Sequence, residues 1–589
     1  MLISLIAWIY ISIICLIWGQ MMLSAVVKTK EFPSLRLNAS LICLAGLAVI
    51  STLALGLSLF MPLDWKAHLI LLIPALAYCR KATNRQAIKI QLGSLTEGLC
   101  LTARYLLAAG ILMVLIISVH SIVHPDTLNY HAMSILLFER YKSIPGIANL
   151  KNEIGFQCGW FAALALFQPD FSISYNIIFL NGAVLCWFLL FVVQQISRSL
   201  LSGPVAPGDA PTPAYPGSQY GWAWLLLLAY TFFSWTQIRL TAASPSPDFI
   251  VSLYSWAAIY LFLQMAPLST PQPLYSSMIV LYCLGAILTK LSAIPLLLLT
   301  ALLLVRYYRL RPAKFMIIYS GLSMLILFLK NRIASGYLLY PLPMPDIFHP
   351  VWKMKAYTIT SFQHYISAYA RFPIDVSDLD KYWPAPFSGW LPRWWHLITL
   401  PDQLLLLGIL IGAILSLIFL AMGKYNAGQI AGKYPVALLI TLAGSLVWFI
   451  GAPSPRFGTG FLVPLLFLLY RNHPLFSLRF FSFGQSRPPR PRHQRHTLSA
   501  LMATGTLLFV IAGYTVYRSI HFLTPGELVY PTGIMTSAYD PIGCEKMQVD
   551  PLKNRIYIRE DTGPVNCIIN RGGFSPLGTS VREGFKPAE

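Results

Sequence analysis

Apolar segments long enough to cross a membrane recur along the whole chain, and they restrict it to one class of fold. A transmembrane helix needs about 20 predominantly apolar residues, and runs near this length fill most of the 589-residue sequence. Charged residues make up only 11% of the chain, whereas soluble proteins carry about 25%. The sequence therefore predicts an all-α polytopic membrane protein with about 14 spans. The predicted spans are Met1–Met22, Asn38–Phe60, Leu63–Cys79, Leu101–His120, Ser172–Val193, Trp222–Leu240, Phe249–Met265, Leu274–Leu288, Leu291–Val305, Phe315–Leu329, Leu404–Ala421, Tyr434–Ile450, Phe457–Leu469 and Ser499–Val516.

Lys and Arg residues collect in four of the connecting loops. Because positive residues favour the cytoplasmic side of a membrane, we expect these loops to be cytoplasmic: 28–36, 80–89, 306–314 and 471–495. The opposite, outer face then holds the loops 121–171, 244–248 and 331–403 and the C-terminal tail. A short apolar run, Trp160–Phe167, would invert this order if it crossed the membrane. We therefore predict that it forms a juxtamembrane helix on the outer surface.

The net charge of +21 does not indicate a nucleic-acid-binding protein. Its densest part is the Pro-rich connection Arg487–His496 between two predicted spans, where basic residues anchor a loop beside anionic lipid. The apolar N-terminus lacks the charged start and the cleavage site of a signal peptide, so we expect it to be retained as the first span. The lipid bilayer is thus an expected partner, and nucleic acid is not.

Three parts can be distinguished along the chain. Residues 1–99 are predicted to be accessory N-terminal spans, residues 100–518 the main body, and residues 519–589 a small β-rich outer tail. Cys544 and Cys567 are the two cysteines of this polar tail, which the topology places in an oxidising space, so we predict a disulfide between them. The tryptophans of the outer loop 331–403 suit either a membrane-interface belt or a surface that contacts sugar and lipid.

Ionisable residues lie where several of the predicted outer loops join the spans. The segment His124-Pro-Asp-Thr-Leu-Asn-Tyr-His131 follows an apolar span and supplies a carboxylate, a phenol and two imidazoles. Other loop ends supply Asp248, Lys290 and Arg456, and Glu139 lies further along the first loop. Such a set is suited to displacement at an anomeric carbon. A carboxylate accepts the proton of the attacking hydroxyl, while basic groups neutralise a departing phosphate.

Spacing within the first of these segments suggests which neighbour orients its carboxylate. On an α-helix, Asp126 and Tyr130 share a face because they are four residues apart, whereas His131 lies partly off that face. We therefore expect Tyr130 to be the better partner of Asp126.

Each of the other residues also has a purely structural interpretation. Asp248 is in position to cap the span that follows it. Arg456 and Lys290 are long enough to extend to the membrane interface. Glu139 and its neighbour Arg140 suit an exposed ion pair of little energetic value.

The motif His124-Pro125-Asp126 resembles the first-loop motif of the GT-C superfamily, the multi-span glycosyltransferases that use polyprenyl-phosphate-linked sugars. A longer succession is similar to a group of bacterial multi-span membrane proteins of unassigned activity: HPDTLNYH, then IPGIAN, IGFQCGW, SPD, SGY and PRF, with a two-cysteine tail. The resemblance covers the chain from about residue 100 onward.

This resemblance implies a GT-C-like helical bundle and specific roles for three residues. Asp126 would be the base that activates the acceptor, Asp248 would match the second acidic residue of the family, and Arg456 would hold the donor phosphate. Thr127 stands where the related HPDE motif has a second acidic residue, so the resemblance implies chemistry without a metal or other cofactor.

The expected activity is transfer of a sugar from a polyprenyl-phosphate donor to a glycan, lipid or protein acceptor of the cell envelope. The enzyme would lie in the bacterial inner membrane with its active face toward the periplasm. We assign catalytic roles to Asp126, Asp248, His131 and Tyr130, and substrate binding to His124, Glu139, Lys290 and Arg456. The alternative is a polysaccharide polymerase, ligase or flippase. A transporter should carry its charges near the middle of its spans, whereas here they stand at span ends.

Overall fold

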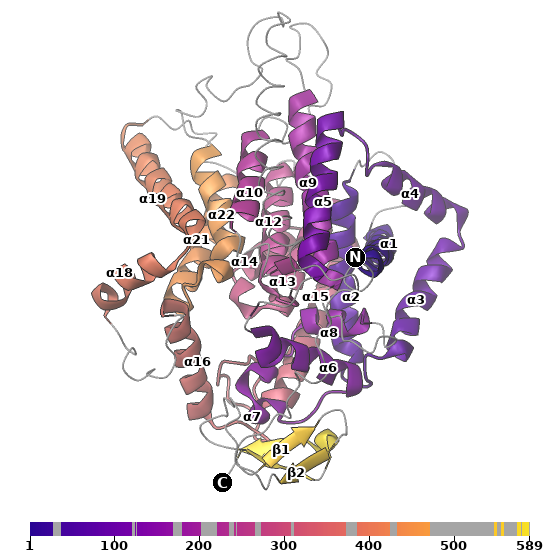
Figure 1. The fold of residues 1–589 in the computed structure, drawn as a ribbon, viewed down its shortest axis with the longest axis vertical. Coiled ribbons are helices and arrows are strands. Elements are labelled where there is room, and N and C mark those ends of the chain that lie inside the picture. Colours follow the sequence, from indigo (N-terminus) through magenta and orange to yellow (C-terminus); the bar gives the residue numbers. More distant parts are fainter. Residues whose placement is uncertain are drawn as a thin grey trace, which may run out of the picture.

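The computed structural model is mostly helical, with a few short strands near the C-terminus (Figure 1). It describes residues 1–26, 37–119, 124, 126–168, 179–201, 221–234, 241–242, 244–265, 272–307, 311–372, 386–423, 433–471, 547–550, 555–558, 574–578 and 580–587. The helices that form the body are α1 (Leu2–Val26), α2 (Ala39–Leu57), α3 (Trp65–Cys79), α4 (Ala82–Gly93), α5 (Leu101–Val119), α9 (Phe179–Leu201), α10 (Gly221–Phe233), α12 (Asp248–Gln264), α13 (Pro273–Thr289), α14 (Leu296–Tyr307), α15 (Arg311–Ser335), α19 (Leu400–Ala421), α21 (Lys433–Gly451) and α22 (Pro455–Arg471). The connecting segments add η2 (Thr127–His131), α6 (Ala132–Arg140), α7 (Ile147–Leu150), η3 (Asn152–Gly155), α8 (Gly159–Leu166), η5 (Leu291–Ala293), α16 (Ala356–Arg371) and α18 (Phe387–Leu397).

Seven helices of the described residues are long and apolar enough to cross a membrane, namely α1, α2, α5, α9, α15, α19 and α21. Six of the remaining predicted spans correspond to shorter apolar helices, which are α3, α10, α12, α13, α14 and α22. The predicted span Ser499–Val516 lies outside the described residues. The helical, membrane-compatible class is therefore confirmed, while the total of about 14 spans stays a prediction.

Helix α9 ends eight residues later than the predicted span, which stopped at Val193. Its polar last turns are buried against the chain that leads into α5. The Gln194 side-chain amide donates to the carbonyl oxygens of Ser94 and Leu95, both at 2.9 Å, and Ser197 Oγ accepts the backbone N–H of Cys100 at 3.0 Å. The helix continues because these polar groups have protein partners, which hydropathy alone does not reveal.

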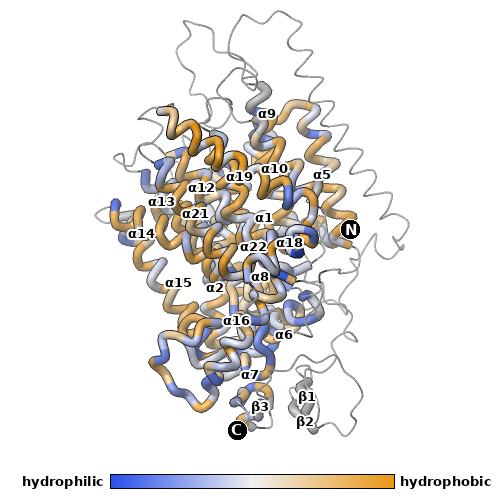
Figure 2. Tube along the Cα trace, turned by 90° about the vertical axis from the view of Figure 1, so that its left-hand side faces the viewer, coloured by the Kyte–Doolittle hydropathy of each residue, from blue (hydrophilic) through white to orange (hydrophobic). Residues whose placement is uncertain are grey.

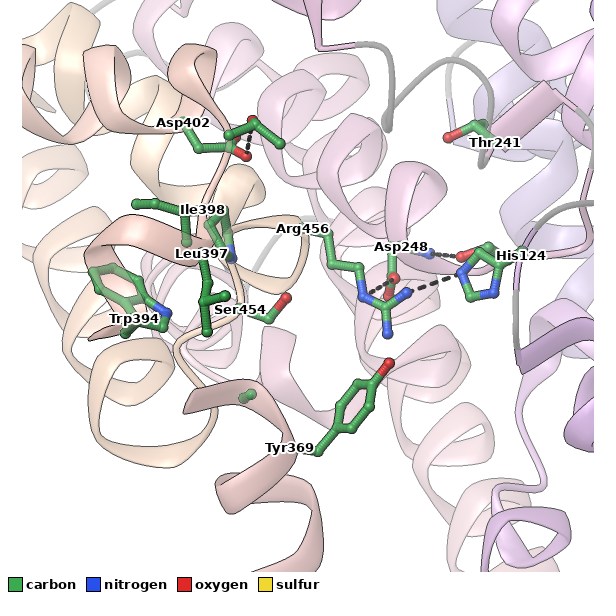
Figure 3. A pocket seen from close by; sticks show the side chains of 14 residues that line it. His124, Thr241, Asp248, Tyr369, Trp394, Leu397, Ile398, Asp402, Ser454 and Arg456 are labelled. Carbon is green, nitrogen blue, oxygen red and sulfur yellow. Dashed lines mark hydrogen bonds and ion pairs between the residues drawn. The ribbon is translucent and has the colours of Figure 1, made fainter. Parts of the chain in front are cut away.

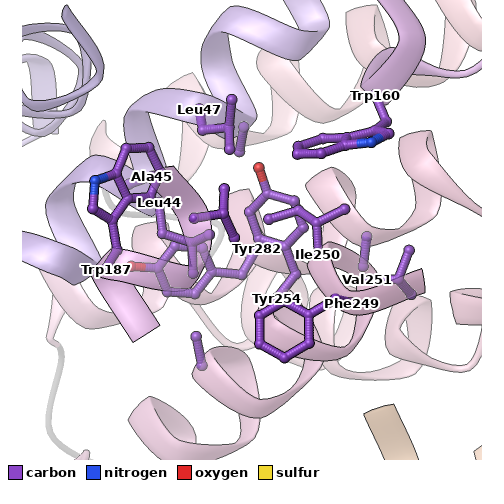
Figure 4. Close-up of a cluster of buried hydrophobic side chains, with 14 of the residues drawn as sticks. Leu44, Ala45, Leu47, Trp160, Trp187, Phe249, Ile250, Val251, Tyr254 and Tyr282 are labelled. Carbon is purple, nitrogen blue, oxygen red and sulfur yellow. The ribbon is translucent and has the colours of Figure 1, made fainter. Parts of the chain in front are cut away.

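Helices from both ends of the sequence share one hydrophobic core. Helices α1 and α2 cross so closely that a Cβ on Gly46 would lie 1.8 Å from the carbonyl oxygen of Cys15, and such contact requires small residues. Figure 4 shows side chains of α2, α8, α12 and α13 meeting around Tyr254 and Tyr282. Within this core the Tyr282 hydroxyl donates to the carbonyl oxygen of Leu41 at 2.7 Å. The first two helices are therefore packed inside the body.

The short apolar run of the first outer loop forms helix α8, and its predicted place on the surface is wrong. Every residue from Gly159 to Leu166 is buried, and the helix packs against α2 and α6. Trp160 is only 1% exposed, and its indole N–H donates to the carbonyl oxygen of Pro245 at 3.0 Å. A helix that is apolar on all sides has no polar face to turn to water, so it belongs inside the protein.

The end of the molecule that carries α6 and α7 holds more hydrophilic residues than the apolar helices α5, α10 and α19 (Figure 2). The C-terminal strands lie at this end as well (Figure 1). Strands β1 (Met547–Asp550) and β2 (Arg555–Ile558) form one antiparallel pair, and β3 (Phe574–Pro576) and β4 (Phe585–Pro587) form another. The tail thus contains strands, as predicted. Cys544 and Cys567 lie outside the described residues, so their disulfide stays a prediction.

The described residues of 574–587, which we call the C-terminal strap, are bound to the loop that carries α6 and α7. Phe585 is fully buried in a cluster with residues of α6 and α7. Its backbone N–H donates to the carbonyl oxygen of Pro145 at 3.0 Å, and its carbonyl accepts from the Asn149 side chain at 3.2 Å. Gly146 has a φ of +64°, and a Cβ there would lie 1.9 Å from the Phe585 carbonyl oxygen. The strap therefore supports the loop from the side away from the bundle.

Replacing Phe585 by Ala is expected to lower the free energy of unfolding by about 3–5 kcal/mol, because it leaves a cavity in a closed cluster. The measurement is chemical unfolding in a mild detergent. Leu577→Ala is the matched control, since Leu577 lies on the same strap and is 38% exposed. Equal losses in the two variants would contradict the assigned role of the strap.

Candidate active site

Three charged residues at helix ends meet at one end of the bundle. Asp248 is the first residue of α12, Lys290 follows the last residue of α13, and Arg456 is the second residue of α22. Helix α12 packs against both α13 and α22. The N-terminal ends of α12 and α22 and the C-terminal end of α13 therefore lie at the same end of the bundle, where their charged side chains meet. The chain from His124 to His131 reaches this place from the end of α5.

The segment that follows His124 is a π-helix, η2, and not the α-helix that the spacing argument assumed. The backbone N–H of Ala132 bonds to the carbonyl oxygen of Thr127, five residues back. π-Turns are rare and frequently occur at functional sites. Residues four apart still lie near one face on such a turn. After burial, the charge of Asp126 is the next influence that raises the pKa of Tyr130, so the expectation that Tyr130 is the better partner of Asp126 stays a prediction.

Arg456 forms the centre of the site. Its guanidinium group is 3.2 Å from a carboxylate oxygen of Asp126. It is also 3.6 Å from a carboxylate oxygen of Asp248 and 3.0 Å from Nε2 of His124, as Figure 3 shows. The Arg456 side chain is 18% exposed. An arginine that only extended to the membrane interface would not turn inward to three acceptors, so the snorkelling interpretation of Arg456 is wrong.

Lys290 completes the network from the other side. Its ammonium group donates to a carboxylate oxygen of Asp248 at 2.6 Å and lies 3.5 Å from the ring centre of Phe457. Asp248 does not cap its own helix, because the cap residue is Pro247 and no side-chain cap bond forms. The structure therefore contradicts both structural interpretations, the cap for Asp248 and the interface anchor for Lys290.

The sequence Ser244-Pro-Ser-Pro-Asp248 fixes where the second carboxylate stands. Ser244 Oγ accepts the backbone N–H of Ser246 at 3.3 Å, and Ser246 Oγ accepts that of Asp248 at 3.4 Å. The carbonyl oxygen of Ser246 is held by the Asn181 side chain at 3.0 Å. These bonds form a tight turn ahead of α12, and the positive end of the helix dipole stabilises the Asp248 carboxylate.

His124 is neutral, and two hydrogen-bond donors point at its ring, which can accept only one hydrogen bond. Burial, and next the charge of Arg456, lower its pKa to about 4. The backbone N–H of Asp126 points at Nδ1 from 3.1 Å, while the guanidinium points at Nε2 from 3.0 Å. A neutral imidazole has a single acceptor nitrogen. His124 therefore bonds fully to one of these donors at a time, so its contact with Arg456 is easily exchanged.

The low pKa of His124 makes stability depend on pH. The group has a pKa of 6.5 in the unfolded chain and about 4 in the folded one, so the unfolded state takes up the proton first. The stabilisation is complete above pH 6.5 and is lost as the pH falls toward 4. Melting temperatures measured between these values should fall more steeply for the native protein than for His124→Asn. The control His349→Asn, at a side chain that is 71% exposed, should follow the native protein. Parallel curves for the native protein and His124→Asn would disprove this linkage.

Tyr130 and His131 lie in η2, and both interact electrostatically with Asp248 and Arg456. Their rings are 4.4 Å apart, and the His131 ring is 5.2 Å from those of His124 and Phe161. Burial lowers the pKa of His131 well below its usual range and raises that of Tyr130 well above it. His131 Nδ1 bonds to no group in the part of the chain that the structure describes. Both residues thus add neutral aromatic side chains next to His124.

Glu139 stands apart from this group. It is buried in α6, eight residues beyond His131, which is roughly 12 Å along a helix. The interpretation of Glu139 as part of an exposed ion pair is wrong, because its side chain is only 5% exposed. Its assignment to substrate binding stays a prediction.

A cavity of about 180 Å³ opens directly on the network. One side is formed by His124, Asp248 and Arg456, and the other by the loop that joins α18 to α19. Figure 3 shows Tyr369 of α16 pointing its hydroxyl toward the guanidinium group from below. The wall opposite Arg456 contains Trp394, Leu397, Ile398 and Asp402. The cavity thus combines a charged wall with a largely apolar one.

Sequence reasoning missed the residues of this second wall. Trp394 was noted only as one of several tryptophans in the outer loop. Its indole N–H donates to the carbonyl oxygen of Pro453, three residues before Arg456, at 2.9 Å. Tyr369 and Asp402 carried no signal beyond residue type, because nothing in their local sequence relates them to Asp126.

A further buried carboxyl group lies near Asp126. Burial raises the pKa of Glu153, which also interacts electrostatically with Asp126 and Lys151. The Lys151 ammonium group donates to the backbone carbonyl of Asn129 at 2.9 Å, within the π-helix. This contact ties η2 to the loop that leads to α8, and so to the part that the C-terminal strap supports. Among the described residues, no group of three His, Cys, Asp or Glu is placed to hold a metal ion.

Comparison with known proteins places the chain in a family without assigning it an activity. No curated protein and no solved structure matches the chain significantly. The sequence profile described as a domain of unknown function, DUF8201, matches residues 1–463. This match includes His124, Asp126, Asp248, Lys290 and Arg456. It also covers α1 to α21 without a break at residue 99. The chain therefore belongs to the DUF8201 family.

Proposed function

We propose that this protein is a membrane glycosyltransferase with a GT-C-like body of about 14 spans, which transfers a sugar from a polyprenyl-phosphate donor to a glycan, lipid or protein acceptor of the cell envelope. The observation that carries the proposal is the charge network of Asp126, Asp248, Lys290 and Arg456, of which Asp248 and Arg456 line a cavity. Clustered acidic and basic groups in a cavity are typical of catalytic sites. Their position at helix ends favours surface chemistry over transport.

Arg456 is the residue best placed to hold the donor phosphate. A guanidinium group binds phosphate through two parallel hydrogen bonds, and here it is shared among three acceptors, of which His124 is easily exchanged. Lys290 adds a second positive charge beside it. Binding of a phosphodiester to Arg456 would loosen its contact with Asp126, so donor binding would free the carboxylate for its role as a base.

The reaction follows from this exchange. The freed Asp126 carboxylate takes the proton of an acceptor hydroxyl, whose oxygen forms a bond to the anomeric carbon. The bond from that carbon to the phosphate oxygen breaks, and polyprenyl phosphate leaves with the electron pair and one additional negative charge. Arg456 and Lys290 neutralise that charge as it develops. Asp248 holds both cations in place.

The surroundings of the cavity suit a lipid-linked donor. Leu397 and Ile398 line it and lead directly into α19, whose hydrophobic side chains are mostly exposed, among them Leu404 and Leu407. A helix with this pattern faces lipid. A donor with its isoprenoid chain along α19 would therefore place its phosphate in the cavity. The distribution of Lys and Arg favours a bacterial inner membrane location with this site on the periplasmic face.

The test is transfer of radiolabelled sugar from a polyprenyl-phosphate pool into the envelope fraction of cells with and without the gene. The proposal requires that transfer be lost in the deletion strain and restored by the native protein. Normal glycans with an altered distribution of lipid-linked precursors across the membrane would instead favour the flippase alternative. Loss of long glycans with normal addition of the first sugars would favour a polymerase or ligase.

A further inference from the structure

Asp402 is the second buried acid of the cavity, and its surroundings differ from those of Asp126 and Asp248. It stands on the wall opposite Arg456, at the start of α19 (Figure 3). Its side chain accepts hydrogen bonds from Thr399 Oγ1 at 2.6 Å and from the Tyr230 hydroxyl at 2.9 Å. Asp402 is only 6% exposed. Two neutral hydroxyl groups therefore orient it toward the cavity.

No cation of the described residues lies within ion-pair distance of Asp402, whereas Asp126 and Asp248 are each paired with basic side chains. A carboxylate offers about four acceptor positions, and the two hydroxyl donors occupy half of them. Burial of a charged group is costly unless its remaining positions are satisfied. Asp402 lines the cavity that a ligand would occupy.

We propose that Asp402 accepts hydrogen bonds from hydroxyl groups of the sugar that is transferred, so that the two walls of the cavity recognise two parts of one donor. Arg456 and Lys290 hold the phosphate, and Asp402 selects the sugar attached to it. This inference rests on the proposed function. It assigns Asp402 a role in specificity and leaves the removal of the acceptor proton to Asp126.

Trp394 gives this wall a second feature that suits a sugar. Its indole lines the cavity, and the bond from its N–H to the Pro453 carbonyl fixes the ring beside the loop that carries Arg456. Aromatic rings present a flat apolar surface with little loss of conformational freedom. A sugar ring packed there would turn its hydroxyl groups toward the neighbouring polar groups, Asp402 and Thr399.

The experiment measures the affinity of the protein in nanodiscs for polyprenyl phosphate and for the same lipid carrying a sugar. The sugars tested in turn are glucose, galactose, mannose and arabinose. The native protein should bind one of the sugar-bearing lipids more tightly than the bare phosphate. Asp402→Asn keeps the shape of the side chain but removes the charge, so this preference should fall by about ten- to hundredfold. The affinity for bare polyprenyl phosphate should stay within about twofold of the native value.

Two further variants keep the test decisive. Tyr230→Phe removes one donor to Asp402 but leaves the carboxylate, so it should retain most of the preference for the sugar-bearing lipid. Asp402→Glu retains the charge, displaces the carboxylate and should reduce the preference, which separates recognition from folding. An unchanged preference in Asp402→Asn, or equal binding of bare and all sugar-bearing lipids by the native protein, would overturn the role of Asp402. Absence of binding to every polyprenyl phosphate would overturn the proposed function itself.

Discussion

Asp126→Asn is expected to lower the rate of sugar transfer by about 10²–10⁴, the usual contribution of a general base. The amide retains the size of the side chain and an oxygen that accepts the guanidinium of Arg456, which lies 3.2 Å away in the native protein. It has no basicity toward an acceptor hydroxyl. The loss should therefore appear in turnover, while expression and donor affinity stay close to native. The measurement is transfer of radiolabelled sugar by the purified variant at saturating donor.

A matched replacement separates this effect from a general loss of negative charge. Asp346→Asn changes a carboxylate that is 49% exposed and pairs with Lys353 at the surface, so its rate should equal the native rate. Asp248→Asn should reduce the rate less than Asp126→Asn, because Asp248 only holds Lys290 and Arg456 in place. Full activity of Asp126→Asn would remove the base assignment.

The parts of the site that could be predicted from sequence are those with a local signal. Hydropathy located the span ends, and charged residues at span ends are unusual enough to be noticed one by one. Their meeting in space depends on contacts across the whole chain: Arg456 and Asp126 are 330 residues apart, and Lys290 and Asp248 are 42 apart. Before the structure did, they were connected by the family resemblance and by the ordering of loops on one face, which was inferred from Lys and Arg counts.

The parts of the structure that the sequence analysis missed or misplaced also depend on contacts between distant segments or on local backbone geometry. The spacing argument for Asp126 and Tyr130 assumed an α-helix, whereas the segment winds as a π-helix. Helix α8 was placed on the surface because it is too short to span a membrane, although its lack of any polar residue already favoured burial. Asp402 was overlooked because an acid at a helix start is common. What distinguishes it is its place in a cavity wall formed by α18 and α19, together with the hydrogen bond from Tyr230 of α10.

Arg456→Ala is expected to have the largest combined effect on stability and binding. It removes one side chain from three acceptors at once and leaves Lys290 as the only described cation within ion-pair distance of Asp248. Breaking a buried ion pair costs about 3–5 kcal/mol. The lower end applies here, because the Asp126 and Asp248 side chains are 23% and 11% exposed and water reaches them in part. Affinity for polyprenyl phosphate should fall by at least tenfold as a charge-assisted phosphate contact is lost.

Arg456→Lys distinguishes the two effects. A lysine keeps the positive charge near Asp126 and Asp248 but lacks the planar fork that holds several acceptors. Its unfolding free energy should therefore recover most of the loss seen in Arg456→Ala, while donor affinity stays low. Lys89→Ala, at an exposed lysine on the opposite side of the predicted topology, serves as the control and should change neither quantity. Native donor affinity in Arg456→Lys would mean that the phosphate needs only a charge. Native affinity in Arg456→Ala would mean that the network stabilises the fold and that the phosphate is bound elsewhere.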